Sequence, residues 1–267
     1  MLPDIVPISP SSLDAWLHCP RLFLDRHLLG VPESDATPST DRGNLVHAIL
    51  RFIHEHGSCH DDAHVVGVLE AHGVADDVHR GFVSRHALRC PHGATRSVHE
   101  YSVARFHRRP APMFMATARI DAIWGFDDLV DVRDYKTGSL FISRVADDPR
   151  ACLQAWILAH DRYLRGRRLR IRYEYLSPDV DEDPESFEPT PDDLEAIEER
   201  LSAAVAAMWE SDWRGRPDED TCRRCAYRSI CPDSAAPSEP SWPSPLAAEA
   251  GDAPCSLRRP GRHPLGV

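Results

Sequence analysis

Apolar and polar positions alternate along residues 117–138, on both sides of a short Gly-Phe-Asp-Asp sequence. Alternation around such a turn predicts a hairpin of two antiparallel strands of ordinary length. Side chains of a strand point alternately to its two faces, so one face of the second strand carries Val130, Val132, Asp134 and Lys136. The two valines indicate that this face is buried, although a carboxylate and an ammonium follow them.

Charges on a buried face predict a site rather than simple packing, because a buried charge is costly unless it is paired or binds a metal. Asp121 on the first strand is a cross-strand neighbour of Asp134, so two carboxylates and Lys136 meet at one strand end. This grouping is typical of a hydrolytic metal site, and an ordinary surface ion pair between Asp134 and Lys136 is the alternative. Lys136 is also the only lysine among 31 lysines and arginines, which suggests that the position needs a compact ammonium.

The remaining patterns predict helices around a small sheet. An N-terminal helix over residues 11–30 is expected to be capped by Ser11 or Ser12 and interrupted at Pro20. Apolar spacing predicts further helices over 42–56, 149–164 and 192–209, with two modest ones within 59–96. Strands are expected over 97–108 and 169–176. This order predicts a mixed α/β domain with an N-terminal helical insertion before the sheet.

Composition and charge are those of a folded domain without a membrane span. The 267 residues are 42% hydrophobic and 27% charged, and no apolar run approaches the length of a membrane helix. The formal net charge of −11 argues against nonspecific coating of nucleic acid, but it is compatible with a nuclease whose carboxylates hold a metal. Residues 1–233 are expected to form one domain, and the Pro-, Ser- and Ala-rich residues 234–267 a disordered tail.

Cysteine usage points to metal rather than to disulfides. The chain has eight cysteines and starts without a signal-peptide pattern, which predicts a reducing, cytoplasmic compartment. Cys222, Cys225 and Cys231 lie within ten residues, the last of them directly before a proline, and Cys19 before Pro20 offers a fourth thiol. Four further cysteines lack a partner spacing and are expected to be ordinary thiols: Cys59, Cys90, Cys152 and Cys255.

Two metal groups compete for the four cysteines at the ends of the domain. A zinc site favours two close pairs, of which the sequence supplies one. A [4Fe–4S] cluster accepts three grouped cysteines and a distant one, often beside proline, and this interpretation is preferred. Buried thiols without metal, and redox chemistry of the C-x2-C pair without its usual βαβ context, are less favoured interpretations.

Six segments, in order, resemble the RecB-like branch of the PD-(D/E)XK nucleases. The likeness is greatest to its iron–sulfur subgroup, which includes the AddB nuclease domain and CRISPR-associated RecB-like exonucleases. The segments lie between residues 9 and 232: SPSSLDAWLHCPRLFL, GNLVH ending at His47, ARIDAI with Asp121, DVRDYKTG with Asp134 and Lys136, Gln154, and the cysteine group. Two positions depart from the family pattern, since Ala118 replaces a usual glycine and Leu158 a frequent tyrosine.

The resemblance implies a restriction-endonuclease-like core and a metal-dependent DNA exonuclease. The implied ligands of Mg²⁺ or Mn²⁺ are His47, Asp121, Asp134 and the carbonyl of Tyr135. Lys136 would orient the attacking water and stabilise charge, Gln154 would support the site or touch DNA, and Glu100 is an additional acidic candidate. The implied ligands of a [4Fe–4S] cluster are Cys19, Cys222, Cys225 and Cys231.

The resemblance also implies DNA as the partner, as single strands or duplex ends, in repair or recombination. No GxxxxGK[ST] motif is present, so the protein would act alone or beside a helicase, recombination or CRISPR partner. A noncatalytic DNA-end-binding scaffold and a zinc-held binding module are the competing hypotheses. Trp156 is a candidate stacking face for a base, and the arginine-rich residues 162–172 are either a phosphate track or a solvated surface.

Overall fold

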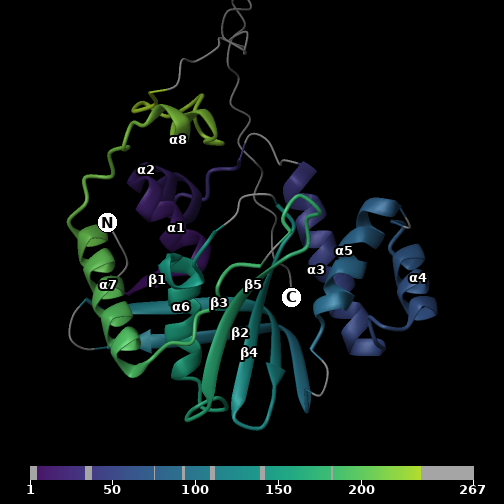
Figure 1. The fold of residues 1–267 in the computed structure, drawn as a ribbon. Helices are drawn as coiled ribbons and strands as arrows, with labels where there is room; N and C mark the ends of the chain where they lie inside the picture. Colours follow the sequence, from purple (N-terminus) through teal and green to yellow (C-terminus); the bar gives the residue numbers. More distant parts are fainter. Residues whose placement is uncertain are drawn as a thin grey trace, which may run out of the picture.

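The structure is a computed structural model that describes residues 5–33, 38–74, 76–91, 94–108, 112–138, 142–181 and 183–235. The expected disordered tail therefore lies outside the described residues from position 236 onward. The strands are β1 (Val6–Ile8), β2 (Arg96–His107), β3 (Phe114–Gly125), β4 (Leu129–Lys136) and β5 (Arg168–Tyr175). The α-helices are α1 (Pro10–His18), α2 (Pro20–Phe23), α3 (Pro38–His56), α4 (Asp62–Ala71), α5 (Asp77–Arg89), α6 (Pro149–Ala159), α7 (Pro191–Trp209) and α8 (Glu219–Arg223) (Figure 1).

Strand β3 is the centre of a small mixed sheet. β2 pairs antiparallel with β3 from Phe114 to Gly125, except at Glu100 and Asp121, which are not paired. β1 pairs in parallel with the first residues of β3, and β4 pairs antiparallel with its last residues, beginning at Ala122. Because β2 occupies one edge of β3, strands β1 and β4 share the other edge and leave residues 117–121 between them. β5 then adds in parallel to β4, so the predicted fold class and hairpin are confirmed.

Helices cover both faces of this sheet, and each face has its own apolar core. Helices α1, α6 and α7 pack on one face, where Val132, Trp156 and Ile171 are fully buried. Helices α3, α4 and α5 pack on the other face around Trp124 and Tyr135, and they form the separate lobe in Figure 1 that was expected as a helical insertion. Across the described ranges, no helix is both long and apolar enough to cross a membrane.

The N-terminal helix begins earlier than its sequence predicted. Ser9, rather than Ser11 or Ser12, is the N-cap of α1, because its Oγ accepts from the amide of Ser12 at 3.2 Å. The Ser12 hydroxyl in turn accepts from the Ser9 amide at 2.7 Å, which completes a capping box. The helix is interrupted where predicted, since Cys19 lies between α1 and α2.

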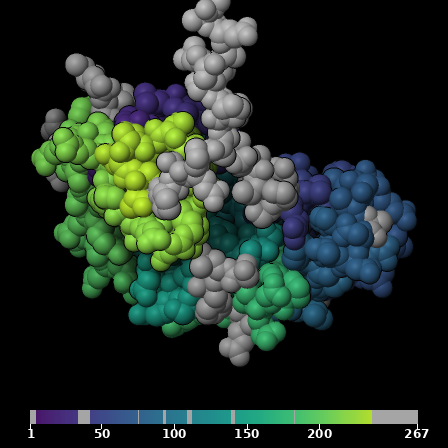
Figure 2. Space-filling view, turned by 90° about the horizontal axis from the view of Figure 1, so that it is seen from above, coloured from purple at the N-terminus to yellow at the C-terminus, as the bar shows by residue number. Residues whose placement is uncertain are grey.

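The two ends of the described chain lie side by side. The Arg216 guanidinium donates to the carbonyl of Leu17 at 3.0 Å, and the Tyr227 hydroxyl donates to the carbonyl of Val31 at 2.9 Å. Figure 2 shows the C-terminal segment, in yellow, against the N-terminal helices, in purple. Residues separated by almost 200 positions therefore form one packing unit.

Candidate active site

Asp121 lies where strands β3 and β4 separate. Regular pairing of the two strands ends at Ala122 and Arg133. The next amide available on β4, that of Tyr135, donates to Oδ2 of Asp121 at 2.8 Å instead of to a main-chain carbonyl. The carboxylate therefore has a fixed position at the point where the sheet opens.

Helix α3 brings His47 to the same point. Its Nδ1 lies 3.3 Å from Oδ1 of Asp121, and its Nε2 lies 3.0 Å from the carbonyl oxygen of Tyr135. Gly43, one turn earlier, allows this approach, because an added Cβ would lie 3.2 Å from Oγ1 of Thr137. Burial alone would lower the pKa of His47, but the hydrogen bond and charge of Asp121 raise it above its ordinary value.

Glu100 of β2 joins this group through an unusual backbone conformation. Its φ of 55° is in the left-handed region, which non-glycine residues rarely adopt. Its carboxylate pairs with Arg119 at 2.8 Å, and donor atoms of His47, Glu100 and Asp121 all lie within 4.8 Å of one another. Strain of this kind is often concentrated at functional sites, and the placement matches the expectation that Glu100 is an additional acidic member.

Asp134 and Lys136 lie side by side at the end of β4. The Lys136 ammonium is 2.5 Å from Oδ1 of Asp134, and the side chains are 21% and 18% exposed, respectively, so they are not a solvated surface pair. The ammonium also lies 4.2 Å from the centre of the Tyr173 ring. Gln154 of α6 donates to the second oxygen of Asp134 at 3.4 Å. The predicted positions His47, Asp121, Asp134, Lys136 and Gln154 thus come from four separate elements, α3, β3, β4 and α6.

His47, Asp121, Asp134 and Gln154 line one open cleft of about 750 Å³. Its floor includes residues of β3 left between β1 and β4, and its walls come from α1, α3, β2 and α6. The lining includes the start of α1 and the charged and amide side chains of the cleft: Ser9, Pro10, Ser11, His47, Arg119, Asp121, Asp134 and Gln154.

The donors in the cleft fit a hard divalent cation. Carboxylates and a backbone carbonyl are the ligands that Mg²⁺ and Mn²⁺ prefer, and imidazole is compatible with Mn²⁺. Adjacent ligands of an octahedral ion at about 2.1 Å lie about 3.0 Å apart. His47 Nε2 and the Tyr135 carbonyl have this separation, 3.0 Å. Asp121 and Asp134 supply charge beside them.

The four cysteines expected to hold a cluster come from the joined chain ends. Burial raises the pKa of Cys225 and of Cys231, and Cys19 lies close enough to raise both further. Cys222 adds to the effect on Cys225. None of the seven cysteines in the described ranges forms a disulfide. Sulfurs of these four residues do not form a group within 4.8 Å in the described structure.

Trp156, the candidate stacking face, is instead part of the core, and several arginines of residues 162–172 form ion pairs within the protein. Trp156 is fully buried, and its Nε1 donates to Glu198 at 2.8 Å, so it cannot stack on a base. Helix α6 also ends at Ala159 rather than at 164. The arginines after it pair within the protein, as with Arg170 and Glu188 at 2.8 Å. Arg172 likewise reaches Asp131 at 3.3 Å.

Cys59 and Cys90, expected to be ordinary thiols without a partner spacing, lie next to two histidines in the structure. Each lies beside a histidine, and the four side chains of His54, Cys59, His86 and Cys90 form a group. The sequence carries a signal for it, since His-x4-Cys and His-x3-Cys recur about 30 residues apart. Cys152 does donate to a backbone carbonyl, that of Ala146, as an ordinary thiol would, and Cys255 lies outside the described residues.

Comparison with known proteins gives one family. A sequence profile of the PD-(D/E)XK nuclease superfamily matches residues 7–232. The comparison with curated proteins gave no match. Among solved structures, the one titled "Crystal structure of SSO0001" is similar over 83% of this chain and 94% of that chain, with 16% identity and a TM-score of 0.36.

Proposed function

Because the chain belongs to the PD-(D/E)XK nuclease superfamily, we propose that it is a divalent-metal-dependent deoxyribonuclease, an exonuclease acting on single-stranded DNA or duplex ends. One observation carries the proposal. His47, Asp121 and Asp134 line one cleft, where the Tyr135 carbonyl faces His47 and the Lys136 ammonium pairs with Asp134. Membership of the superfamily supports nuclease chemistry, and the RecB-like motifs support the choice of DNA ends.

His47, Asp121, Asp134 and the Tyr135 carbonyl would hold Mg²⁺ or Mn²⁺, with Glu100 as an additional ligand or a ligand to a bound water. The ion would polarise a phosphodiester oxygen and lower the pKa of a water molecule. The protein supplies the preorganisation. Asp134 and Tyr135 are neighbours at the end of β4, and the Tyr135 amide holds the Asp121 carboxylate beside them.

Lys136 places positive charge where the phosphate gains negative charge. Asp134 and the face of Tyr173 hold its ammonium in place, and the Tyr173 hydroxyl is itself fixed by Asp148 at 2.8 Å. A fixed donor at such a position stabilises the transition state without reorganising during the reaction. Gln154 orients Asp134 through its amide nitrogen, while its buried Oε1 has no hydrogen-bond partner among the described residues.

The cleft also offers local attraction for a phosphate backbone within an acidic protein. The first turn of α1, from Pro10, lines the cleft beside its cap Ser9. The N-terminal end of a helix carries partial positive charge, which favours phosphate. Arg119 adds a largely exposed guanidinium at the same cleft.

We further propose that Cys19, Cys222, Cys225 and Cys231 hold a [4Fe–4S] cluster with a structural role. Three grouped cysteines and a distant fourth, with prolines after two of them, suit such a cluster better than they suit a zinc site, which favours two close pairs. The cluster would join the two chain ends that already contact each other through Arg216.

The cellular setting is part of the same proposal. Cysteine-rich metal sites without disulfides are typical of the reducing cytoplasm, and DNA repair or recombination is the process that RecB-like motifs support. A helicase, recombination or CRISPR protein is the kind of partner that would deliver DNA ends.

The test is cleavage of end-labelled single-stranded and duplex DNA with Mg²⁺ or Mn²⁺, using anaerobically purified protein. Lys136→Ala should reduce cleavage by about 100-fold or more, with Arg214→Ala as a control that removes an exposed cation elsewhere. The pattern of labelled products gives the polarity. Wild-type protein that carries its cluster and binds DNA ends but cleaves no substrate would favour a noncatalytic scaffold.

A further inference from the structure

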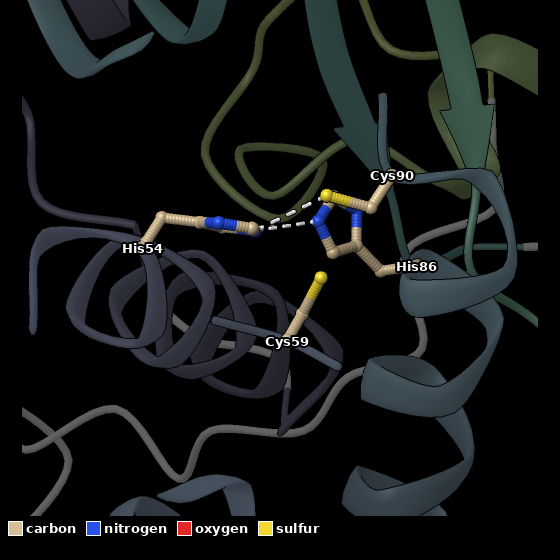
Figure 3. A group of neighbouring side chains, drawn as sticks. All are labelled: His54, Cys59, His86 and Cys90. Atoms are coloured by element: carbon tan, nitrogen blue, oxygen red, sulfur yellow. Dashed lines mark hydrogen bonds between the residues drawn. The ribbon is translucent and has the colours of Figure 1, made fainter. Parts of the chain in front are cut away.

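A second group of metal-type donors lies in the helical lobe, away from the cleft. His54 is in the last turn of α3, and His86 is in the last turn of α5. Cys59 follows α3, and Cys90 is the C-cap of α5. Figure 3 shows the four side chains pointing toward a common centre. Nε2 of His54 lies 2.8 Å from Nε2 of His86 and 4.0 Å from Sγ of Cys90, and the four donor atoms all lie within 4.8 Å of one another.

We propose that these four residues bind one structural zinc ion. Two imidazole nitrogens and two sulfurs are a donor set that selects zinc over Mg²⁺ or Ca²⁺, which prefer oxygen. The exposed fractions of His86, Cys59 and Cys90 are 0%, 4% and 7%. Polar groups so far from water need a partner. Four protein ligands would fill a tetrahedral site, as in structural rather than catalytic zinc centres.

The close spacing favours a single ion over a cluster. Nitrogen donors around tetrahedral zinc lie about 3.4 Å apart, and sulfurs about 3.8 Å apart. The group is already this compact, and the two rings need to separate by only about half an ångström, which small side-chain rotations provide.

Buried groups behind His86 prepare it as a ligand. Its Nδ1 lies 2.7 Å from Oε1 of Glu174, so this carboxylate holds the ring proton and leaves Nε2 facing the centre of the group. Arg133 bonds the other oxygen of Glu174 at 2.7 Å, and it also reaches Asp131 at 2.9 Å. Histidine ligands of zinc commonly donate their second ring N–H to a carboxylate in this way. The sequence analysis did not identify Asp131 or Arg133, the two other charged residues of β4, as parts of a site.

The ion would connect the helical lobe to the active site without taking part in the chemistry. His54 follows His47 by seven residues on α3, so both side chains lie on one face of the helix, two turns apart. The His86 ring packs at 5.2 Å against the ring of Tyr135, whose carbonyl faces His47. Zinc at this position would therefore fix the C-terminal end of α3, two turns from the proposed metal ligand His47.

The first test uses the wild-type full-length protein, purified anaerobically from zinc-supplemented medium. We expect about one zinc per chain in addition to iron. X-ray absorption at the zinc edge should show two sulfurs at about 2.3 Å and two nitrogens at about 2.0 Å. Absence of zinc would overturn the proposal, as would one zinc bound by four sulfurs, which would place it at the chain ends. Two zinc ions per chain, with an average of three sulfurs and one nitrogen around each, would support the proposed zinc site. They would also indicate that zinc, rather than an iron–sulfur cluster, occupies the four cysteines at the chain ends.

Variants then assign the ligands. Cys59→Ser and Cys90→Ser should each lose at least ten-fold in zinc affinity and keep their iron, whereas Cys152→Ser, a buried thiol elsewhere, should keep both metals. Zinc retained at full affinity by both site variants would overturn the assignment. A Cys59–Cys90 disulfide found by mass spectrometry of the anaerobic wild type would do so as well. The absorption measurement needs no variant, so it decides the matter if the variants do not fold.

Discussion

The amide of Tyr135 donates to the carboxylate of Asp121 at 2.8 Å, and the carbonyl of the same Tyr135 faces His47 at 3.0 Å. One peptide segment thus fixes one candidate ligand through its N–H and is itself another through its C=O. The relative placement of these donors depends on strand geometry rather than on flexible side chains, which is the preorganisation that a metal site requires.

Two substitutions of Asp121 should separate its role as a proposed metal ligand from its role as the acceptor of the Tyr135 amide. Asp121→Asn keeps an oxygen for the Tyr135 amide and removes the charge, so Mg²⁺-dependent cleavage should fall about 100-fold or more while the free energy of unfolding changes by less than about 1 kcal/mol. Asp121→Ala also leaves the amide without an acceptor, which should cost about 1–3 kcal/mol. Urea unfolding and a cleavage assay measure both effects. Equal stability of the two variants would contradict the structural role.

The cluster ligands should be identifiable by colour. Cys225→Ser should lose iron and visible absorbance under anaerobic purification, because three remaining thiolates bind the cluster poorly. Protease sensitivity should then rise in residues 213–231, which the cluster would hold against the N-terminal helices. Cys152→Ser should remain coloured. A colourless wild type that contains zinc at these four cysteines would show the zinc interpretation to be the right one.

Trp156 should matter for stability and not for DNA binding. Its ring is fully buried and its Nε1 is bonded to Glu198, so Trp156→Ala should destabilise the protein by about 3–5 kcal/mol. Trp209 is 41% exposed, and Trp209→Ala should cost clearly less. Thermal unfolding gives the comparison. The milder Trp156→Phe should leave DNA affinity unchanged. A selective loss of DNA affinity in that folded variant would show that Trp156 contributes to DNA binding.

Asp148 should make stability depend on pH. It caps α6 and binds Arg150 at 2.7 Å and the Tyr173 hydroxyl at 2.8 Å. Burial alone would raise the pKa of Asp148, but Arg150 and Tyr173 together hold it below its usual range. Because the pKa of Asp148 in the folded state lies below its unfolded value of about 3.9, the ionised carboxylate stabilises the protein at pH values above about 3.9. This stabilisation is lost as the pH falls through the folded-state pKa.

The matched comparison is wild type against Asp148→Asn, which can still cap the helix but carries no charge. At pH 7 the variant should have a free energy of unfolding lower by about 1–3 kcal/mol. The difference should shrink as the pH falls below about 4. Both proteins share all other titrating groups, so the difference in urea unfolding isolates Asp148. A difference independent of pH would show that its charge contributes nothing.

The hairpin and the residues of its cleft were predictable because a period of two identifies both the strands and the face that each side chain occupies. Val130 and Val132 marked a buried face, which made the charges of Asp134 and Lys136 conspicuous. His47 was predicted from its place in a family motif and not from its helix, since the pattern of α3 does not single it out among 15 histidines.

What the sequence did not predict depends on contacts between distant segments. Strand β1 has three residues, too few for any periodicity, and it exists because β3 offers a free edge. Trp156 looked like a binding residue because an aromatic side chain on a helix is equally suited to a core or to a base. The group around His54 and His86 required knowing that the ends of α3 and α5 meet, which depends on packing against the sheet.

The pairing of the chain ends has a consequence for synthesis on the ribosome. The residues that make the cleft, from His47 to Gln154, are translated well before Trp213 and Tyr227, which pack against Phe23 and Val31. Helices α1 and α2 must therefore remain without their final partner until the last part of the domain leaves the exit tunnel. The N-terminal helices of the domain are therefore among the last of its elements to be fixed, after translation of the segment with Trp213 and Tyr227.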